Sequence, residues 1–133
     1  MKKKTPPRIG ATDKGNEDDQ FNYRYFGGFW KLITATETPY FNNKKLKEKA
    51  KNYKLPLLIE LDMMRILWHP DSKKEKAFPF HLFRKKIITT DFFSEMDVSA
   101  KYEFGDNSMI WRFVLNFNPD SYSVIEYHFV KEN

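Results

Sequence analysis

The clearest pattern in the sequence is an alternation of apolar and polar residues through its C-terminal third. Apolar side chains occupy every second position over most of residues 97–104, 108–117 and 122–131. A period of two is typical of strands that bury one face and expose the other. Two short turns, Gly105-Asp106-Asn107 and Asn118-Pro119-Asp120-Ser121, separate the three segments. The pattern therefore predicts an antiparallel meander.

Three more strands are expected before the meander, over residues 24–36, 57–68 and 78–90. The first of them is rich in aromatic residues, and Gly27-Gly28 indicates a bulge or a sharp bend within it. Pro39 is expected to end this first strand, because proline cannot donate a backbone hydrogen bond. The count of likely strands is then six.

The segment 57–68 is ambiguous between a strand and a helix. On a helix, one face would carry Leu57, Leu61, Met64 and Trp68. On a strand, one face would carry Leu57, Ile59, Leu61 and Met63. We favour a bulged strand because strands are expected around it, and the helix stays open as the alternative.

A basic helix is predicted over residues 43–54. Asn42-Asn43 can cap its start, and Leu46, Ala50 and Tyr53 follow the i, i+4, i+7 spacing of one narrow apolar face. The residues around that face are Lys44, Lys45, Lys47, Lys49, Lys51 and Lys54, with Glu48 as the one acid. This segment is the densest basic feature of the chain.

Together these elements predict a mainly β fold, an antiparallel curved sheet or small barrel of about six or more strands with one basic helix. The alternative is an α+β fold, which applies if 57–68 is helical. Residues 1–20 contain few apolar side chains and predict a basic, polar arm that is flexible or ordered by a partner. Residues 21–133 are expected to form a single β-rich domain.

Composition and charge narrow the classes of function. The chain has 133 residues, no cysteine and a formal net charge of +5 at pH 7. The lack of cysteine excludes disulfides, thiolate metal sites and cysteine nucleophiles, and no apolar run is long enough for a transmembrane helix. Residues 1–55 carry 13 Lys and Arg against 6 Asp and Glu, whereas residues 56–133 carry 10 against 12. The basic excess in the first part indicates an anionic partner.

The leading functional hypothesis is a non-enzymatic interaction or structural module that binds a partner protein, an assembly or further copies of itself. The basic arm and the predicted helix would supply the contacts, and nucleic acid is a further candidate partner. The expected partner-binding residues are Lys44, Lys45, Lys47, Lys49, Lys51, Arg84, Lys85 and Lys86.

A resemblance to a known family supports an alternative function. The segment Gly28-Phe29-Trp30-Lys31-Leu32 resembles the Gly-x-Trp-Lys-Leu of the first strand in calycins, the lipocalin-like and fatty-acid-binding barrels. The segment Tyr127-His128-Phe129-Val130-Lys131 is similar in character to their last strand. The resemblance implies an up-and-down barrel with an apolar cavity, Trp30 at its floor, and a carrier of an apolar small molecule. The expected cavity residues are Trp30, Tyr102, Trp111, Phe113 and Tyr127.

No catalytic residue, metal ligand or cofactor is predicted. The histidines lack metal-binding spacing, and no phosphate loop or nucleophile motif is present. An enzyme is therefore the weakest class, with Glu60, Asp62 and His81 as its candidate residues. Because Thr5-Pro6-Pro7-Arg8 stands where a signal peptide would be apolar, the expected location is the cytoplasm, with a mature secreted form as the alternative.

Overall fold

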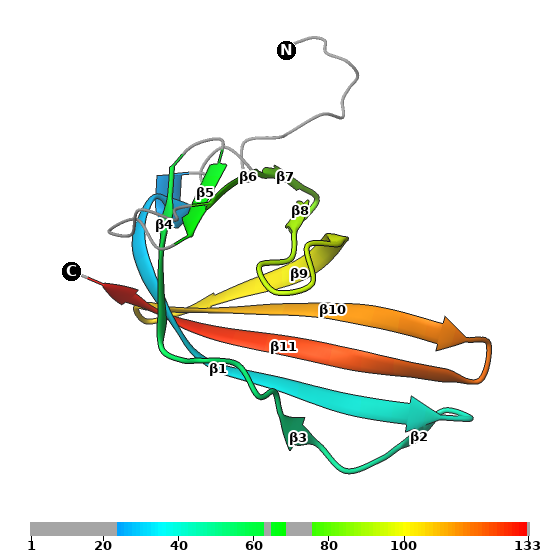
Figure 1. The fold of residues 1–133 in the computed structure, drawn as a ribbon. Coiled ribbons are helices and arrows are strands. Elements are labelled where there is room, and N and C mark those ends of the chain that lie inside the picture. Colours follow the sequence, from blue (N-terminus) through cyan, green and yellow to red (C-terminus); the bar gives the residue numbers. More distant parts are fainter. Residues whose placement is uncertain (1–23, 63–64, 69–75, 133) are drawn as a thin grey trace, which may run out of the picture.

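The computed structural model describes residues 24–62, 65–68 and 76–132, and these form one antiparallel sheet nearly closed into a barrel (Figure 1). The mainly β, barrel-like fold predicted from the sequence is confirmed. The strands are β1 (Gly28–Phe41), β2 (Lys44–Lys45), β3 (Lys49–Ala50), β4 (Leu57–Leu61), β5 (Arg65–Trp68), β6 (Lys76–Pro79), β7 (His81–Phe83), β8 (Lys86–Thr90), β9 (Asp97–Gly105), β10 (Ser108–Asn118) and β11 (Ser121–Glu132). The predicted arm over residues 1–20 lies outside the described residues.

The strand order closes the sheet by placing the first strand beside the last. It runs β6-β5-β4-β1-β11-β10-β9-β8-β7, with β2 and β3 also paired to β1. The two edge strands, β6 and β7, are joined in the chain through Phe80 alone. Across this seam the Thr89 hydroxyl donates a 2.8 Å hydrogen bond to the Pro79 carbonyl. The result is an up-and-down sheet with one seam.

The prediction of a helix over residues 43–54 is wrong, because the chain forms the short strands β2 and β3 there. Asn42 and Asn43 instead form a two-residue hairpin turn with φ of 50° and 63°, and the chain then runs back along β1 as β2 and β3. Asparagine tolerates this left-handed region, so residues that can cap a helix also suit a hairpin turn. Leu46 and Ala50, expected on a buried face, are exposed. Lys44 and Lys45 lie on β2 and Lys49 lies on β3, two short edge strands where charge discourages pairing with another chain.

Two of the predicted strands are divided into hairpins. Residues 57–68 contain β4 and β5, which pair with each other, so neither a single bulged strand nor the alternative helix is present. Residues 78–90 contain parts of three strands, with a turn at Arg84 and Lys85, which have φ of 52° and 64°. The meander of β9, β10 and β11 is found within one residue or so of the predicted bounds.

The first strand also differs from its prediction. Residues 24–26 are helical, and β1 continues through Pro39 to Phe41. The Pro39 carbonyl accepts a 2.9 Å hydrogen bond from the Leu46 N–H, so the missing proline N–H faces the short β2 side and not β11. Proline is tolerated where it faces such an edge, and it therefore does not end the strand.

A loop between β8 and β9 fills the barrel with aromatic side chains. The Phe92 ring is buried, with its centroid 5.5 Å from Trp111 and 6.0 Å from Tyr127. The Phe93 ring stacks on Tyr53 at 3.7 Å. These contacts make the barrel interior a packed core.

The buried Asp91 carboxylate fixes this loop. It accepts hydrogen bonds from the Tyr127 hydroxyl at 2.5 Å, from the Ser94 hydroxyl at 2.7 Å and from the Ser94 N–H at 2.9 Å. Burial beside the Asp91 carboxylate raises the pKa of Tyr127 well above its ordinary value, which keeps its hydroxyl a donor. The loop is thus tied to the last strand.

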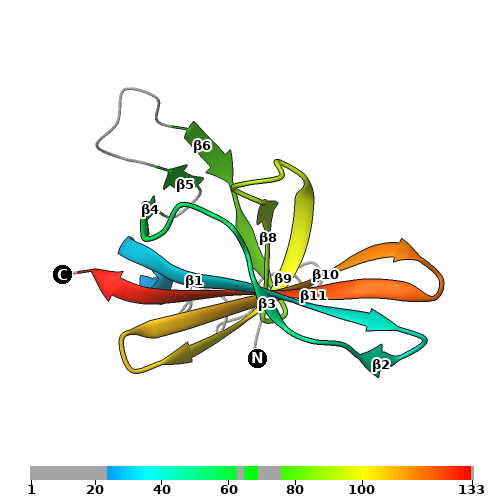
Figure 2. The same cartoon turned by 60° about the horizontal axis from the view of Figure 1, so that its bottom comes forward.

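The strands β1, β10 and β11 are longer than their neighbours and extend beyond the barrel (Figure 1). Figure 2 shows that the β1–β2 turn and the β10–β11 turn project at the same end. A hydrogen bond of 2.8 Å from the Asn42 N–H to the Asp120 carbonyl links the two turns. Among the described segments, no helix has the length and apolar character needed to cross a membrane.

Candidate functional site

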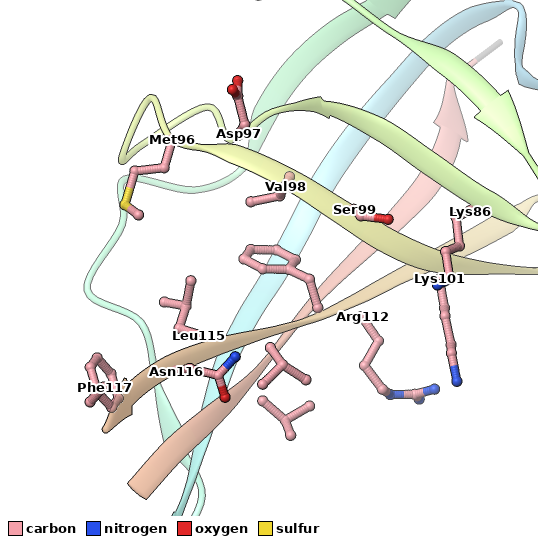
Figure 3. A pocket seen from close by; sticks show the side chains of 13 residues that line it. Lys86, Met96, Asp97, Val98, Ser99, Lys101, Arg112, Leu115, Asn116 and Phe117 are labelled. Carbon is pink, nitrogen blue, oxygen red and sulfur yellow. The ribbon is translucent and has the colours of Figure 1, made fainter. Parts of the chain in front are cut away.

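A pocket of about 740 Å³ opens in the barrel wall where β9 and β10 separate. The two strands pair only from Gly105 opposite Ser108 to Lys101 opposite Arg112. Beyond that pair β9 continues along β8, whereas β10 continues along β11 into the projecting end. Figure 3 shows the two ribbons diverging around the pocket. The strand pairing therefore produces the hollow.

Apolar side chains make up about half of the lining, and most of them come from the two diverging strands. They are Met96, Val98, Phe113, Val114, Leu115, Phe117 and Val124. The polar lining residues are Lys86, Asp97, Ser99, Lys101, Arg112 and Asn116. Met96, Val114 and Phe117 remain 57%, 51% and 62% exposed, so they have apolar surface left to bury. We call this hollow the wall pocket.

Three cations lie side by side at the end of the wall pocket where the strands converge. Lys86 of β8 is directly opposite Lys101 of β9, and Lys101 is directly opposite Arg112 of β10. Directly opposite residues on antiparallel strands project from the same face, with Cβ atoms about 4.5–5.5 Å apart. Figure 3 shows the Lys101 and Arg112 side chains extending in the same direction. We call Lys86, Lys101 and Arg112 the cation row.

Acidic neighbours lie at the Arg112 end of the cation row. The Arg112 Nε donates a 2.6 Å hydrogen bond to Glu126, and its Nη1 lies 3.7 Å from the Glu103 carboxylate. The Glu126 carboxylate also bonds the His128 Nε2 at 3.1 Å. Burial raises the pKa of Glu126, but the hydrogen bonds from His128 and Arg112 outweigh it and hold that pKa below its ordinary value. Arg112 is thereby fixed in position.

The two lysines of the cation row, unlike Arg112, have no acidic partner among the described residues. Within residues 24–62, 65–68 and 76–132, no carboxylate lies within 4.0 Å of the Lys86 or Lys101 ammonium groups. Both residues are exposed, so their charges are solvated in the absence of a ligand. The positive charge of the row is therefore concentrated at its β8–β9 end.

The lysines predicted to bind a partner lie on two separate surfaces. Four of them are exposed along β2, β3 and the residues between, and we call Lys44, Lys45, Lys47 and Lys49 the lysine edge. Lys51 differs from these, because its ammonium group donates a 3.1 Å hydrogen bond to the Glu37 carboxylate. The structure therefore gives Lys51 a stabilising contact within the fold.

The other predicted basic group, Arg84, Lys85 and Lys86, lies at the β7–β8 turn on the barrel, away from the lysine edge at the projecting end (Figure 1). Of the three, Lys86 lines the wall pocket. The Arg84 guanidinium lies 5.1 Å from the centre of the Phe83 ring. The structure does not combine all eight predicted residues into one surface.

The aromatic residues expected to line an interior cavity all belong to the buried core. They are Trp30, Tyr102, Trp111, Phe113 and Tyr127. Trp30 is fully buried, its Nε1 donates a 2.8 Å hydrogen bond to the Phe26 carbonyl, and the Lys131 ammonium lies 4.5 Å from its ring centre. Of the five, Phe113 also lines the wall pocket. The structure thus places one expected cavity residue at the hollow in the wall.

The candidate residues of the enzyme hypothesis lie on different parts of the sheet. Glu60 is on β4, and Asp62 follows it and accepts a 3.0 Å hydrogen bond from the Arg65 Nε. His81 is exposed on β7, at the other end of the strand order. In the described part of the chain, no group of three His, Asp or Glu side chains is placed to hold a metal ion.

The sequence pattern did not predict most of the wall pocket. It predicts a continuous meander in which the apolar positions of residues 97–104, 108–117 and 122–131 lie on one buried face. The signal that could have revealed the hollow is a difference in length, because β10 and β11 have eleven and twelve residues whereas β9 has nine. Their alternating pattern therefore continues beyond the point where β9 can cover it.

We found no match between this chain and any protein-family model, any curated protein or any solved structure.

Proposed function

We propose that this protein is a non-enzymatic binding protein that carries a small molecule with an apolar body in its wall pocket. The observation that supports this proposal is the separation of β9 from β10, which leaves apolar side chains of both strands facing a hollow of about 740 Å³. Small-molecule sites commonly have volumes of roughly 300–1,000 Å³ and a mainly apolar lining with a few polar groups.

Burial of exposed apolar surface would supply the driving force. Met96, Val114 and Phe117 are more than half exposed in the free protein. Complete burial of one such side chain is worth about 1.5–3 kcal/mol, so partial burial of several offsets the cost of immobilising a small ligand.

The strand order also supports the proposal through the calycin resemblance. The resemblance implies an up-and-down barrel with Trp30 at the floor of an apolar cavity, and the strands here form an up-and-down sheet in which Trp30 is buried. The proposed position of the ligand differs from the expectation, because aromatic side chains fill the barrel interior and the hollow lies in the wall. The proposal is therefore a carrier with a lateral binding site.

A bulky side chain placed in the hollow tests the proposal. Ser99 is exposed on β9 and lines the wall pocket, whereas Asp106 is exposed in the turn that follows β9 and does not line it. We expect Ser99→Trp to weaken the binding of decan-1-ol at least tenfold in isothermal titration calorimetry and Asp106→Trp to leave it unchanged. Equal affinities of the wild-type protein and Ser99→Trp, or a wild-type protein that binds neither decan-1-ol nor an anion with the same chain, would contradict the proposal.

A second candidate function is the docking of an acidic protein on the lysine edge. The observation that favours it is that Lys44, Lys45, Lys47 and Lys49 are all exposed on one edge, next to the exposed apolar side chains of Phe41 and Leu46. A basic patch of this kind attracts and orients an acidic surface.

Poly-L-glutamate serves as the acidic probe for the lysine edge. Replacement of Lys44, Lys45 and Lys47 by Glu should abolish binding at low salt without changing the melting temperature, whereas replacement of the same three by Arg should preserve binding. Lys51 is left intact because its ion pair with Glu37 stabilises the fold. Unchanged affinity of the Glu variant would remove this candidate function.

A further inference from the structure

We infer that the ligand of the wall pocket is an amphipathic anion whose acidic group is held by the cation row. This inference rests on the proposed function and adds the chemical class of the ligand. Three observations support it: the direct pairing of like charges, the distribution of charge along the pocket, and the fixed position of Arg112.

The direct pairing of Lys86 with Lys101 is unfavourable for the fold itself. The two residues are opposite each other on adjacent antiparallel strands, and like charges in that position destabilise a sheet. Arg112 lies opposite Lys101 on the other side, so Lys101 has a cation on both flanks. An anionic group bound over Lys101 would replace this repulsion with two or three favourable contacts, some of them charge-assisted hydrogen bonds.

The charge along the wall pocket sets one orientation for such a ligand. The cation row occupies the end where β9 and β10 converge, and Asp97 lines the opposite end. Lys101 and Asp97 are four residues apart on β9, about 13 Å at 3.3 Å per residue. The acidic group is therefore attracted to the convergent end and repelled from the other, while apolar side chains of residues 113–117 line the space between.

Arg112 and the lysines contribute in different ways. The Arg112 guanidinium is held by Glu126 at 2.6 Å and by Glu103 at 3.7 Å, so its remaining N–H groups are oriented before a ligand arrives. The Lys86 and Lys101 side chains have no carboxylate within ion-pair distance in the described part of the chain, and each offers three donors on a flexible stem. A carboxylate and a phosphate monoester share the chemistry that this arrangement would bind.

The test compares ligands that share a chain but differ in charge. We would measure the affinities of decanoate, decyl phosphate and decan-1-ol for the full-length chain by isothermal titration calorimetry at low salt. We expect at least one of the two anions to bind about tenfold or more tightly than the alcohol, because a hydrogen bond to a charged group is typically worth more than one to a neutral group. Lys101→Gln should lower the affinity for that anion much more than the affinity for decan-1-ol and so remove most of the difference. Lys44→Gln, which removes a lysine of the lysine edge, is the matched control and should change neither affinity.

The outcomes separate this inference from the proposed function on which it rests. If the alcohol binds as tightly as both anions, or if Lys101→Gln leaves the anion affinity unchanged, the inference fails while the wall pocket remains a ligand site. A loss of anion affinity in Lys44→Gln equal to that in Lys101→Gln would show a general effect of net charge and would also overturn the inference. If none of the three ligands binds, the proposed function fails as well. Comparison of decanoate with decyl phosphate then identifies which acidic group the site prefers.

Discussion

Among single residues, Lys101 has a like charge directly opposite it on both neighbouring strands. It lies between Lys86 and Arg112 in the sheet register. We expect Lys101→Gln to raise the free energy of unfolding of the unliganded protein by about 0.2–1 kcal/mol, because it removes two like-charge pairs. Urea denaturation at low salt measures this change, and Lys44→Gln is the control with no expected gain. A lower stability of Lys101→Gln would show that the row is not under repulsion. The gain should shrink at high salt, which screens exposed charges.

Ionisation of the Glu37 side chain is expected to contribute to the pH dependence of the free energy of unfolding in acid. A hydrogen bond from the Ser123 hydroxyl is the largest cause that holds the pKa of Glu37 below its ordinary value of 4.5, and Lys51 adds a second bond. A lowered pKa in the folded state contributes stability that is complete above the ordinary value and is lost as the pH falls through the lowered one. We therefore expect the free energy of unfolding to fall as the pH drops below about 4.5, and Glu37→Gln to lose less over that range.

Chemical denaturation at neutral and acid pH checks the role of Glu37. The exposed Glu48 of the lysine-rich segment provides the control, because it is part of no salt bridge found among the described residues. If Glu37→Gln and Glu48→Gln have the same acid sensitivity as the wild-type protein, the hydrogen bond from Ser123 does not carry this part of the pH dependence.

At the scale of the elements, a buried hydrogen bond ties the loop of residues 91–96 to the last strand. The Tyr127 hydroxyl donates to the Asp91 carboxylate, and both groups are buried. We expect Tyr127→Phe to lower the free energy of unfolding by about 1–3 kcal/mol, because it leaves a buried acceptor with one partner fewer. Tyr122→Phe, which affects a half-buried ring on the projecting end, should change stability by less than about 0.5 kcal/mol. Equal effects of the two substitutions in urea denaturation would contradict the role of this contact.

The hairpin turns give a second prediction at this scale. Lys85 has φ of 64°, a left-handed conformation that is unfavourable for a lysine, whereas Asn43 has φ of 63° with a side chain that tolerates it. Lys85→Gly should therefore stabilise the protein by about 1 kcal/mol and Asn43→Gly by clearly less. Thermal unfolding by circular dichroism measures both. Destabilisation by Lys85→Gly would contradict the assigned turn.

The same turns show how far the sequence predicts the elements. The meander was predicted well because Gly105-Asp106-Asn107 and Asn118-Pro119-Asp120-Ser121 have turn chemistry and the strands between them alternate regularly. The turns at Asn42-Asn43 and Arg84-Lys85 were missed, since asparagine also caps helices and two basic residues give no local signal for positive φ. The helix over 43–54 was predicted from the i, i+4, i+7 spacing of Leu46, Ala50 and Tyr53, but this spacing also occurs in the exposed edge segment that the structure has there.

For the whole molecule, the position of the candidate site depends on contacts distant in the sequence. The pairing of β1 with β11 joins the two ends of the described chain, and no local pattern in the sequence predicts which strands pair across that distance. The wall pocket could not be inferred from a local pattern either, because it exists only where β9 follows β8 while β10 follows β11. Lys86 and Lys101 are likewise separated by a whole loop and meet only in the sheet register.

The wall pocket as the ligand site is the central claim, and titrations of the ¹⁵N-labelled protein with decan-1-ol and with decanoate test it most directly. The expected result is that amide shifts in two-dimensional NMR spectra concentrate in residues 97–101 and 112–117, the two diverging strand segments that line the pocket. Shifts confined to the core around Trp30 and Tyr102, shifts confined to the lysine edge, or no shifts at all would contradict the claim.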